Sequence, residues 1–482
     1  MSSIHHRPAS VLATRRQLLN QTGVNLGRIA LGSLLLGATP PPLMSSDKPA
    51  GTLAPRKPHF PATAKRVIHL FMAGAPSHLD LFDYKPELVK LEGQPLPKSV
   101  IGDQRFAFIR GDAAVMAPQF TIKPRGQSGL TISDMMPHLA KVADDICLIK
   151  SMRTDQFNHA PGQIFLNTGF SQPGRPSLGS WAVYGLGAET TELPAYVVMS
   201  SGKGVSGGSA NWASGFMPTL YSGCRFRNQG DPILDTSNPA GIDAQLQRES
   251  IDLISGLNRA HLDLVGDPEI ATRIANYEMA YRLQSSAPEL MDLKTETKAT
   301  MELYGCEADK PSFNRSCLLA RRMIERGVRF INIYHEGWDA HSGLVDNHKN
   351  MCEETDQGAA ALVADLKQRG LLDDTLVIWG GEFGRTPMVE NNPVLGRSKG
   401  RDHHPHAFTM WMAGGGLKRG FSYGTTDDLG YQVVDKPVHV HDLQATVLHL
   451  LGFDHERLTY QFAGRDFRLT DVHGHVVKDI IA

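Results

Sequence analysis

The stretch Arg66-Val-Ile-His-Leu-Phe-Met-Ala-Gly-Ala-Pro-Ser-His-Leu-Asp80 decides the fold. Its first seven residues are largely apolar, which is typical of a strand that is buried on both faces of a sheet. The tight turn that follows presents a hydroxyl, an imidazole and a carboxylate. Because ligands of open α/β sheets bind outside the carboxyl ends of the strands, the stretch predicts a buried strand that ends at a polar site.

The rest of the chain alternates between apolar runs and amphipathic stretches. The runs predict further strands at 146–150, 195–199, 328–334, 375–379 and 407–412. The amphipathic stretches predict helices at 242–257, 268–284, 312–327, 353–369 and 441–451. This alternation indicates an α/β fold, a three-layer sandwich whose mostly parallel sheet carries helices on both faces. Residues from about 225 to 320 contain no convincing strand, so we expect a helical insertion there.

Composition excludes some classes of function. The 482 residues have a formal net charge of −1, so no general electrostatic field attracts nucleic acid or an anionic membrane. The five cysteines are scattered without a Cys-x-x-Cys pair, which argues against a zinc site made of thiolates. Cys306 and Cys317 have a separation that is compatible either with a disulfide or with two free thiols.

The first 40 residues resemble a twin-arginine export signal. Arg15-Arg16 precedes a weakly apolar run, 26–38, which Arg28 interrupts and which is too short to span a bilayer. A basic amphipathic helix or a membrane anchor is the alternative. Residues 41–62, rich in Pro, Ser and Lys, are expected to form a linker, and residues 63–482 the folded domain. The signal predicts a periplasmic or extracellular protein that uses the twin-arginine machinery and has no stable membrane span once mature.

Carboxylates and imidazoles gather next to the predicted strands. Each group alone has a structural explanation, such as a turn cap or a surface ion pair, but parallel strands bring their carboxyl ends to one edge. Asp402, His403 and His404 differ, because they precede the predicted strand at 407–412 and do not follow a strand. A loop would have to bring them to that edge. The residues are Ser77 and Asp80, His159, Asp339 and His341, Glu382 and Arg385, and Asp402, His403 and His404.

These residue types indicate metal-dependent chemistry on an anionic group. Carboxylates and neutral imidazoles bind Zn, Mn, Fe or Mg, with Ca also open. Two metals held about 4 Å apart would polarise a phosphoryl or sulfuryl oxygen and activate a hydroxyl or water. Arg385 has the forked donor geometry that suits a tetrahedral anion. Ser77, on the first strand-end turn, is the candidate nucleophile, and His159 is a further catalytic candidate.

An ordered set of motifs resembles the exported bacterial family called domain of unknown function 1501, a sulfatase-like group within the alkaline phosphatase superfamily. The match runs from about residue 15 to the C-terminus. The motifs are Gly74-Ala-Pro-Ser-His-Leu-Asp80, Phe82-Asp-Tyr-Lys-Pro86, Pro176-Ser-Leu-Gly-Ser-Trp181, Gly337-Trp-Asp-Ala-His341, Gly381-Glu-Phe-Gly-Arg-Thr-Pro387, Gly400-Arg-Asp-His-His404, Ala413-Gly-Gly-Gly416 and Gly464-Arg-Asp-Phe-Arg-Leu-Thr470.

The resemblance implies an alkaline-phosphatase-like fold and a metal-binding site. It assigns metal ligation to Asp80, Asp339, His341, Glu382, Asp402, His403 and His404. The sequence departs from the superfamily in two places, because the second loop has Asp-x-His spacing and Glu382 stands where an Asp-His pair is expected. These departures argue against two metals and leave one metal, or none, open.

Two functions follow as expectations. The first is a secreted metal-dependent hydrolase of phosphate or sulfate esters, with an anionic ester, such as one on a polysaccharide, as its substrate. The second is a non-catalytic exported binding or assembly protein that keeps the fold with a degenerate site. Metal analysis of the purified protein discriminates between them.

Overall fold

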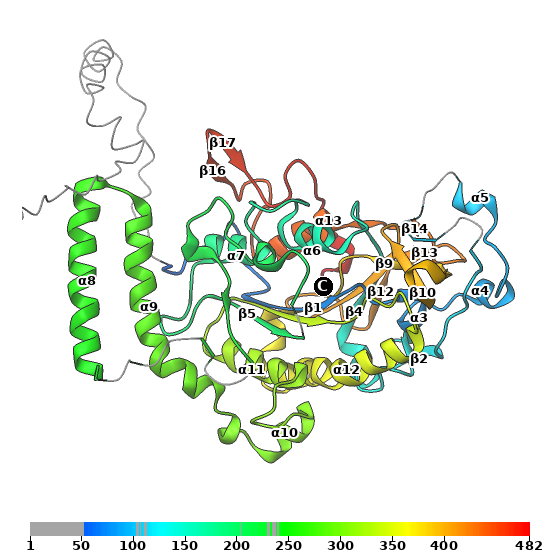
Figure 1. Cartoon of the computed structure of the whole chain (residues 1–482), viewed down its shortest axis with the longest axis horizontal. Helices are drawn as coiled ribbons and strands as arrows, with labels where there is room; N and C mark the ends of the chain where they lie inside the picture. The colour runs from blue at the N-terminus through cyan, green and yellow to red at the C-terminus, as the bar shows by residue number, and fades with distance from the viewer. Residues whose placement is uncertain are drawn as a thin grey trace, which may run out of the picture. The chain divides into compact units, whose positions relative to one another are not determined.

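A nine-stranded sheet lies at the centre of the described part of the protein (Figure 1). The computed structural model describes residues 53–102, 106, 108–109, 113–202, 204–228, 232–233, 238 and 241–482. Residues 50–482 form one compact unit. The predicted export signal and the first part of the predicted linker lie outside the described residues.

Most strands of the sheet are parallel, as predicted. Only β11 among the described strands of this sheet runs antiparallel, to both β4 and β8. All six predicted strands are present. The strand order is β12 (Phe421–Tyr423), β4 (Ile146–Arg153), β11 (Phe408–Ala413), β8 (Thr375–Gly380), β1 (Arg66–Ala73), β7 (Phe330–Glu336), β5 (Tyr196–Ser201) and β6 (Cys224–Arg225), and β15 (Val438–His439) pairs with β4.

Strand β1 shows why its apolar run decides the architecture. Its side chains alternate between two hydrophobic cores, one on each face of the sheet. Ile68, Leu70 and Met72 pack in one core, and Val67 and Phe71 pack in the other. Parallel pairing with β7 and β8 on either side buries the strand completely. A sheet with two apolar faces requires a layer of helices on each.

The two helical layers cover opposite faces of the sheet (Figure 1). The chain therefore has the predicted α/β architecture. The larger core includes side chains of α9 (Pro268–Met291), α11 (Phe313–Glu325) and α12 (Leu344–Gln368). The second core includes side chains of α6 (His159–Thr168), α7 (Leu178–Leu186) and α13 (Val440–Leu450).

Smaller elements surround these layers. The remaining helices are α3 (His78–Leu81), α4 (Pro86–Lys90), α5 (Lys98–Ile101), α8 (Ala244–Val265) and α10 (Lys298–Tyr304). Short hairpins are formed by β2 (Ile122–Arg125) with β3 (Leu130–Ser133), β9 (Gly384–Asn392) with β10 (Arg397–His404), β13 (Thr425–Thr426) with β14 (Val433–Asp435), and β16 (Tyr460–Phe462) with β17 (Arg465–Phe467).

The hairpin β9–β10 corrects one expectation about the sheet edge. Residues 402–404 lie in β10 and not in a loop that crosses the sheet. Because β11 runs antiparallel to its neighbours, its first residue, Phe408, pairs with Met152 near the carboxyl end of β4. The start of β11 and the ends of the parallel strands therefore share one edge, and the hairpin lies at that edge.

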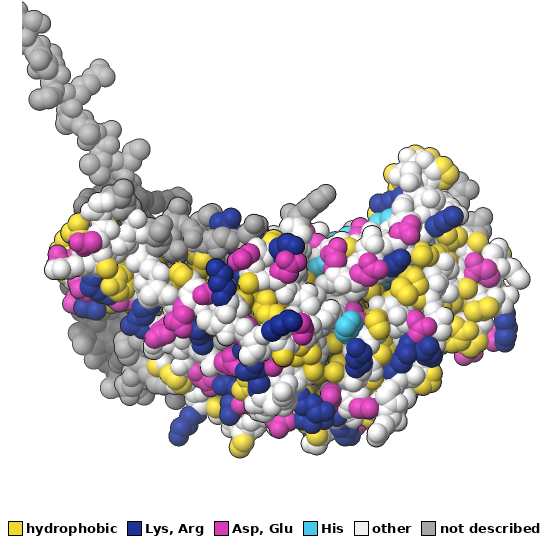
Figure 2. Space-filling view, turned by 90° about the horizontal axis from the view of Figure 1, so that it is seen from below, with side chains coloured by type: hydrophobic (Ala, Val, Ile, Leu, Met, Phe, Trp, Pro, Cys, Tyr) yellow, Lys and Arg dark blue, Asp and Glu magenta, His cyan; other side chains and the backbone are white. Residues whose placement is uncertain are grey.

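Charged side chains of both signs cover the face that Figure 2 shows. There, basic and acidic side chains of the described residues alternate without a large area of one sign (Figure 2). No described helix is both long and apolar enough to cross a membrane. The five cysteines are free, so Cys306 and Cys317 do not form a disulfide.

Candidate metal centre

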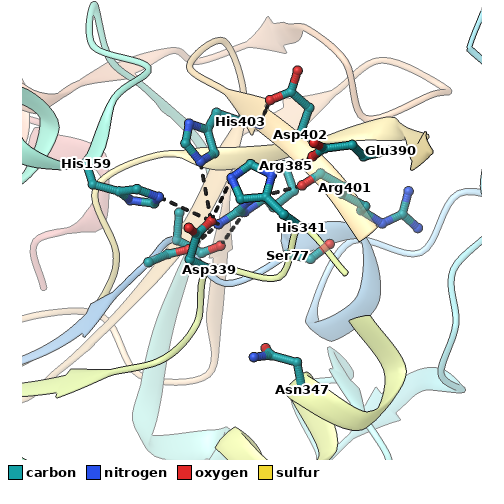
Figure 3. A network of polar contacts seen from close by, with 12 residues as sticks. Ser77, His159, Asp339, His341, Asn347, Arg385, Glu390, Arg401, Asp402 and His403 are labelled. Atoms are coloured by element: carbon teal, nitrogen blue, oxygen red, sulfur yellow. Dashed lines mark hydrogen bonds and ion pairs between the residues drawn. The ribbon is translucent and has the colours of Figure 1, made fainter. Parts of the chain in front are cut away.

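Asp339, which follows β7 by three residues, is the point on which the polar groups of the sheet edge converge (Figure 3). Its Oδ1 lies 3.2 Å from Nε2 of His159, 3.1 Å from Nε2 of His341 and 3.4 Å from Nε2 of His403. Arg385 donates to the same oxygen through Nη2 at 2.7 Å. The Asp339 side chain is 39% exposed, so the cluster is accessible from one side.

The three imidazoles come from three segments that the sheet brings together. His159 is the first residue of α6, which follows β4. His341 lies in the loop after β7, and His403 lies in β10 just before β11. The ends of β4 and β7 and the start of β11 share one edge, and the side chains therefore meet although 244 positions separate His159 from His403.

Each imidazole is anchored through its other ring nitrogen. Nδ1 of His159 lies 2.7 Å from Oε1 of Glu382, and Nδ1 of His341 bonds to Oε2 of Glu390. Nδ1 of His403 donates to the carbonyl oxygen of Phe157 at 2.7 Å. Histidines that bind metals are held in this way, with one nitrogen donating to a carboxylate or carbonyl and the other directed at the metal. All three Nε2 atoms are thereby directed at one point.

The spacing of these atoms fits a small divalent metal. The ligand atoms of His159, Asp339, His341 and His403 all lie within 4.8 Å of one another. A tetrahedral site with ligand bonds of about 2.0–2.1 Å has edges of roughly 3.3 Å between ligand atoms. The three distances from Asp339 Oδ1, 3.1–3.4 Å, match such edges. The donor set of imidazole nitrogen and carboxylate oxygen favours Zn, Mn or Fe.

The carboxylates of the cluster favour positive charge on two of its imidazoles. Burial lowers the pKa of His159, but the carboxylates of Asp339 and Glu382, which lie close to its two ring nitrogens, outweigh this effect and raise that pKa to about 9. The pKa of His341 is raised in the same way against burial, by Asp339 and Glu390. Burial alone would raise the pKa of Asp339, yet the imidazoles and Arg385 hold it well below its usual range. In the metal-free protein, imidazole protons supply the positive charge.

His403 differs from the other two imidazoles. Burial lowers its pKa to about 4, and the nearby Asp339 only partly opposes this shift. Its Nδ1 proton is directed at a backbone carbonyl and not at a carboxylate. His403 is therefore neutral at physiological pH, with the lone pair of Nε2 available to a metal.

Glu382 anchors the cluster from beneath and is not directed at its centre. Its buried carboxylate accepts hydrogen bonds from the backbone N–H of Gly74 and from Nε2 of Gln163, each at 3.0 Å, in addition to His159. Gly74 has a φ of +111°, and a Cβ there would lie 2.4 Å from the backbone nitrogen of Asp339. Only glycine permits this approach of the loops after β1 and β7. Glu382, a predicted ligand, bonds to His159 and is not among the grouped ligand atoms around Asp339.

Glu390 is a buried member of the network that the sequence reasoning missed. It lies in β9, bonds to His341 and pairs with Nη1 of Arg397 at 2.8 Å. With His341 and Asp402 it forms a second group of closely spaced ligand atoms. Asp402, however, accepts the backbone N–H groups of Phe108 at 2.9 Å and His403 at 2.7 Å. Asp402 thus joins β10 to Phe108 next to His403.

Asp80, a predicted ligand, lies outside the group of ligand atoms around Asp339. Its carboxylate forms a buried bidentate pair with Arg401, with distances of 2.8 Å to Nε and 3.2 Å to Nη2. It also accepts the hydroxyl of Ser77 and the backbone N–H of Gln119. Both oxygens are engaged by these donors, so the carboxylate stabilises the fold beneath the site.

Ser77 and Arg385 do not occupy the positions that their predicted roles require. Ser77 is completely buried and its hydroxyl donates to Asp80, which turns it away from Asp339. Arg385 is also completely buried and donates to the backbone carbonyls of Gly74, Ala75 and Arg401. Its remaining contact orients Asp339. Neither residue has the access to solvent that a nucleophile or an anion-binding group needs.

His404 is buried next to His403 but points elsewhere. Its Nε2 lies 2.5 Å from the carbonyl oxygen of Tyr431, and burial lowers its pKa to about 3. Successive side chains of a strand point to opposite sides, and His403 and His404 follow this rule in β10. Of the predicted site residues, the structure therefore unites His159, Asp339, His341, Glu382, Arg385, Asp402 and His403, and leaves Ser77, Asp80 and His404 outside.

The fold and this cluster define an α/β protein with a candidate metal centre of three imidazoles and one carboxylate. The chain belongs to the family described as Protein of unknown function (DUF1501), whose profile matches residues 64–481. No functionally curated protein matches the sequence.

Solved structures that are similar to parts of this chain include a sulfatase and an alkaline phosphatase. PsFucS1 sulfatase from a Pseudoalteromonas species has a TM-score of 0.35 at 13% identity, over 83% of this chain and 69% of that chain. Alkaline phosphatase from the Antarctic bacterium TAB5 has a TM-score of 0.31 at 12% identity, over 81% of this chain and 97% of that chain. At these values the likeness carries no information about the activity of this chain.

Proposed function

We propose that the protein is an exported, metal-dependent hydrolase of phosphate or sulfate esters. The observation that carries the proposal is the convergence of three anchored imidazoles on the carboxylate of Asp339. Two fully buried glutamates, Glu382 and Glu390, each hold one of these imidazoles through its Nδ1 atom. A divalent metal held there would polarise an ester oxygen and lower the pKa of a water molecule.

The residues of the chain would divide the remaining tasks. His159, His341 and His403 hold the centre, and Glu382, Glu390 and the Phe157 carbonyl fix the orientation of their rings. Arg385 keeps Asp339 ionised and in place. The exposed side of Asp339 is where substrate approaches. Since the Ser77 hydroxyl is buried and bound to Asp80, we assign the attack to water.

The alternative is an exported binding protein that holds a metal without catalysing a reaction. The observation that favours it is the engagement of Ser77 and Arg385 in the buried network, which leaves no described arginine of the cluster free to hold an anion.

Fusing residues 1–40 to a reporter tests the export that both functions assume. Retention of the reporter in the cytoplasm would contradict it.

The two functions differ in one assay. The purified full-length protein, loaded in turn with Zn²⁺, Mn²⁺, Fe²⁺ or Mg²⁺, is tested on a phosphomonoester, a phosphodiester and a sulfate ester. We expect hydrolysis of at least one ester that a chelator abolishes and the metal restores. A stoichiometrically loaded protein that hydrolyses none of the three would support the binding protein and overturn the hydrolase.

Replacing the carboxylates that anchor the rings should weaken metal binding without removing a ligand. Glu390→Gln leaves the size of the side chain unchanged but weakens its hold on His341, so the metal affinity should fall about 10- to 100-fold. Competition with a chromophoric chelator measures the affinity. Glu354→Gln is the matched control, because Glu354 also pairs with a histidine, His335, at 2.9 Å, but outside the cluster. Equal affinities for Glu390→Gln and the unchanged protein would refute the anchoring role.

Metal binding should also depend on pH in a defined direction. The pKa of His159 is raised to about 9, so below pH 9 its ring carries a proton that a metal must displace. The apparent affinity should therefore rise with pH, by up to about tenfold per pH unit for each proton released, and level off above about pH 9. Chelator titrations at pH 6, 7, 8 and 9 measure this slope. An affinity that is constant over that range would show that no imidazole proton is displaced.

A further inference from the structure

The outer face of helix α8 is an exposed apolar surface that the proposed function does not use. α8 packs against α9, which lies between α8 and the sheet (Figure 1). Arg248 of α8 bridges to Glu278 of α9 at 2.8 Å, and Ile251 and Ser255 are buried on this side. We call the set Leu246, Ser250, Leu253, Leu257, Ala260 and Leu264 the leucine seam.

The leucine seam faces away from α9. At 100° per residue its members fall within about 80° of arc, roughly opposite Ile251 and Ser255. Leu253 is 66% exposed, Leu257 is 65% exposed and Leu264 is 84% exposed. Ile254 and Val265 extend the apolar surface on one side of the seam, and both are exposed. Isolated exposed leucines are common, but a continuous row along 22 residues of one helix is not.

The spacing of the seam is that of a coiled coil, and it is symmetric. Its members are separated alternately by four and three residues, which is the a/d pattern that packs one helix against another. The order Leu, Ser, Leu, Leu, Ala, Leu reads as large, small, large, large, small, large from either end. Two such helices placed antiparallel would bring Leu246 opposite Leu264, Leu253 opposite Leu257, and Ser250 opposite Ala260. Large residues then meet large ones and small residues meet small ones.

The exposed area is sufficient for a specific contact. From their exposed fractions, the apolar side chains of this face offer on the order of 600 Å² in each copy, or roughly 1,200 Å² in a pair, the lower end of stable protein interfaces. A patch of this size on one molecule is at the upper end of what monomeric proteins expose. A twofold axis makes the same patch serve both partners.

We propose that α8 forms an antiparallel pair with α8 of a second copy of this chain, which makes the protein a dimer. The partner is a second copy because a symmetric seam is complementary to itself when its direction is reversed. The interface lies on the helical layer that α9 separates from the sheet and does not involve the cluster around Asp339. The dimer is therefore independent of the hydrolase proposal, and metal content and ester hydrolysis do not test it.

The first experiment measures the mass of the full-length protein in solution by sedimentation over a range of micromolar concentrations. We expect the mass of two chains for the unchanged protein and of one chain for Leu253→Glu/Leu257→Glu, because this variant places four carboxylates at the centre of the paired seam. Both leucines are exposed in the single chain and glutamate is a good helix former, so the fold should survive, as circular dichroism will show. Arg259→Glu, on the charged side of α8, changes the net charge equally and should remain a dimer.

The second experiment tests the direction of the helices. Mixing a Ser250→Cys chain with an Ala260→Cys chain should give an oxidised cross-link between the two, whereas either chain alone should give little. A cross-link in Ser250→Cys alone would indicate parallel pairing and overturn the antiparallel arrangement. An unchanged protein that sediments as one chain, or a Leu253→Glu/Leu257→Glu variant that still sediments as two, would overturn the dimer.

Discussion

His403→Gln is expected to remove the metal from the protein, whereas His404→Gln is expected to leave it bound. The two histidines are neighbours in β10 and both are buried. Nε2 of His403 is directed at Asp339, whereas Nε2 of His404 is directed at the carbonyl of Tyr431. Losing a direct ligand should lower the affinity by more than the about 10- to 100-fold that a lost anchoring partner produces.

The measurement is the metal content of each variant after dialysis against a weak chelator, together with its thermal unfolding. His404→Gln serves as the control, because it introduces the same substitution one position away and perturbs the same strand. A His403→Gln protein that keeps one metal per chain would remove His403 from the centre. Loss of metal from His404→Gln with an intact fold would show that the site lies on the other side of β10.

Asp80→Ala is expected to lower the free energy of unfolding by about 3–5 kcal/mol and to leave the metal in place. Asp80 and Arg401 are both completely buried, and their bidentate pair joins α3 to β10. Removing the carboxylate leaves a guanidinium in the interior without its counter-charge, which is far more costly than losing an exposed ion pair. Urea unfolding measures the change, and elemental analysis measures the metal.

The control for this prediction is Glu87→Ala, which removes the exposed partner of Lys90 in α4. Surface ion pairs of this kind contribute little to the free energy of unfolding. The Glu87→Ala variant should therefore unfold at the same urea concentration as the unchanged protein. If Asp80→Ala instead lost the metal while unfolding at the same urea concentration as the unchanged protein, Asp80 would be a ligand, as its position after β1 first suggested.

The strands could be predicted because burial on both faces leaves a clear pattern. Runs such as 375–379 and 407–412 are apolar throughout, and the structure places a strand at each. Helix α6 is not among the predicted helices, although its first residue, His159, is a predicted catalytic candidate. Two residues in the sequence mark the ends of this helix. Asn158 is of a type that often precedes a helix, and Gly169, which adopts a left-handed conformation, follows the last helical residue, Thr168. No sequence pattern indicates that β11 runs antiparallel to β4 and β8, because the direction of a strand depends on the strands with which it pairs.

The members of the site could be predicted better than their roles. The rule that strand ends converge placed Asp339 and His341 at one edge, and the structure brings them together with His403, which precedes a strand. The same rule could not separate Asp80 from Asp339, because both carboxylates follow buried strands. What separates them is Arg401, which is 321 positions from Asp80 in sequence and captures it in the interior.

Two partners of the imidazoles lay beyond the reach of sequence reasoning. Glu390 lies in the middle of a strand, and only the pairing of β9 with β10 brings it to His341. The carbonyl of Phe157 is a backbone group, which every residue possesses and no sequence pattern marks. Both partners depend on tertiary contacts, and together with Glu382 they orient the three rings.

Anomalous diffraction at the absorption edge of the metal, from crystals of the loaded protein, tests the central claim most directly. We expect one strong peak per chain, bounded by Nε2 of His159, His341 and His403 and by the carboxylate of Asp339. A peak that lies away from these four residues, or a protein that binds no metal stoichiometrically, would show that these residues do not form a metal centre.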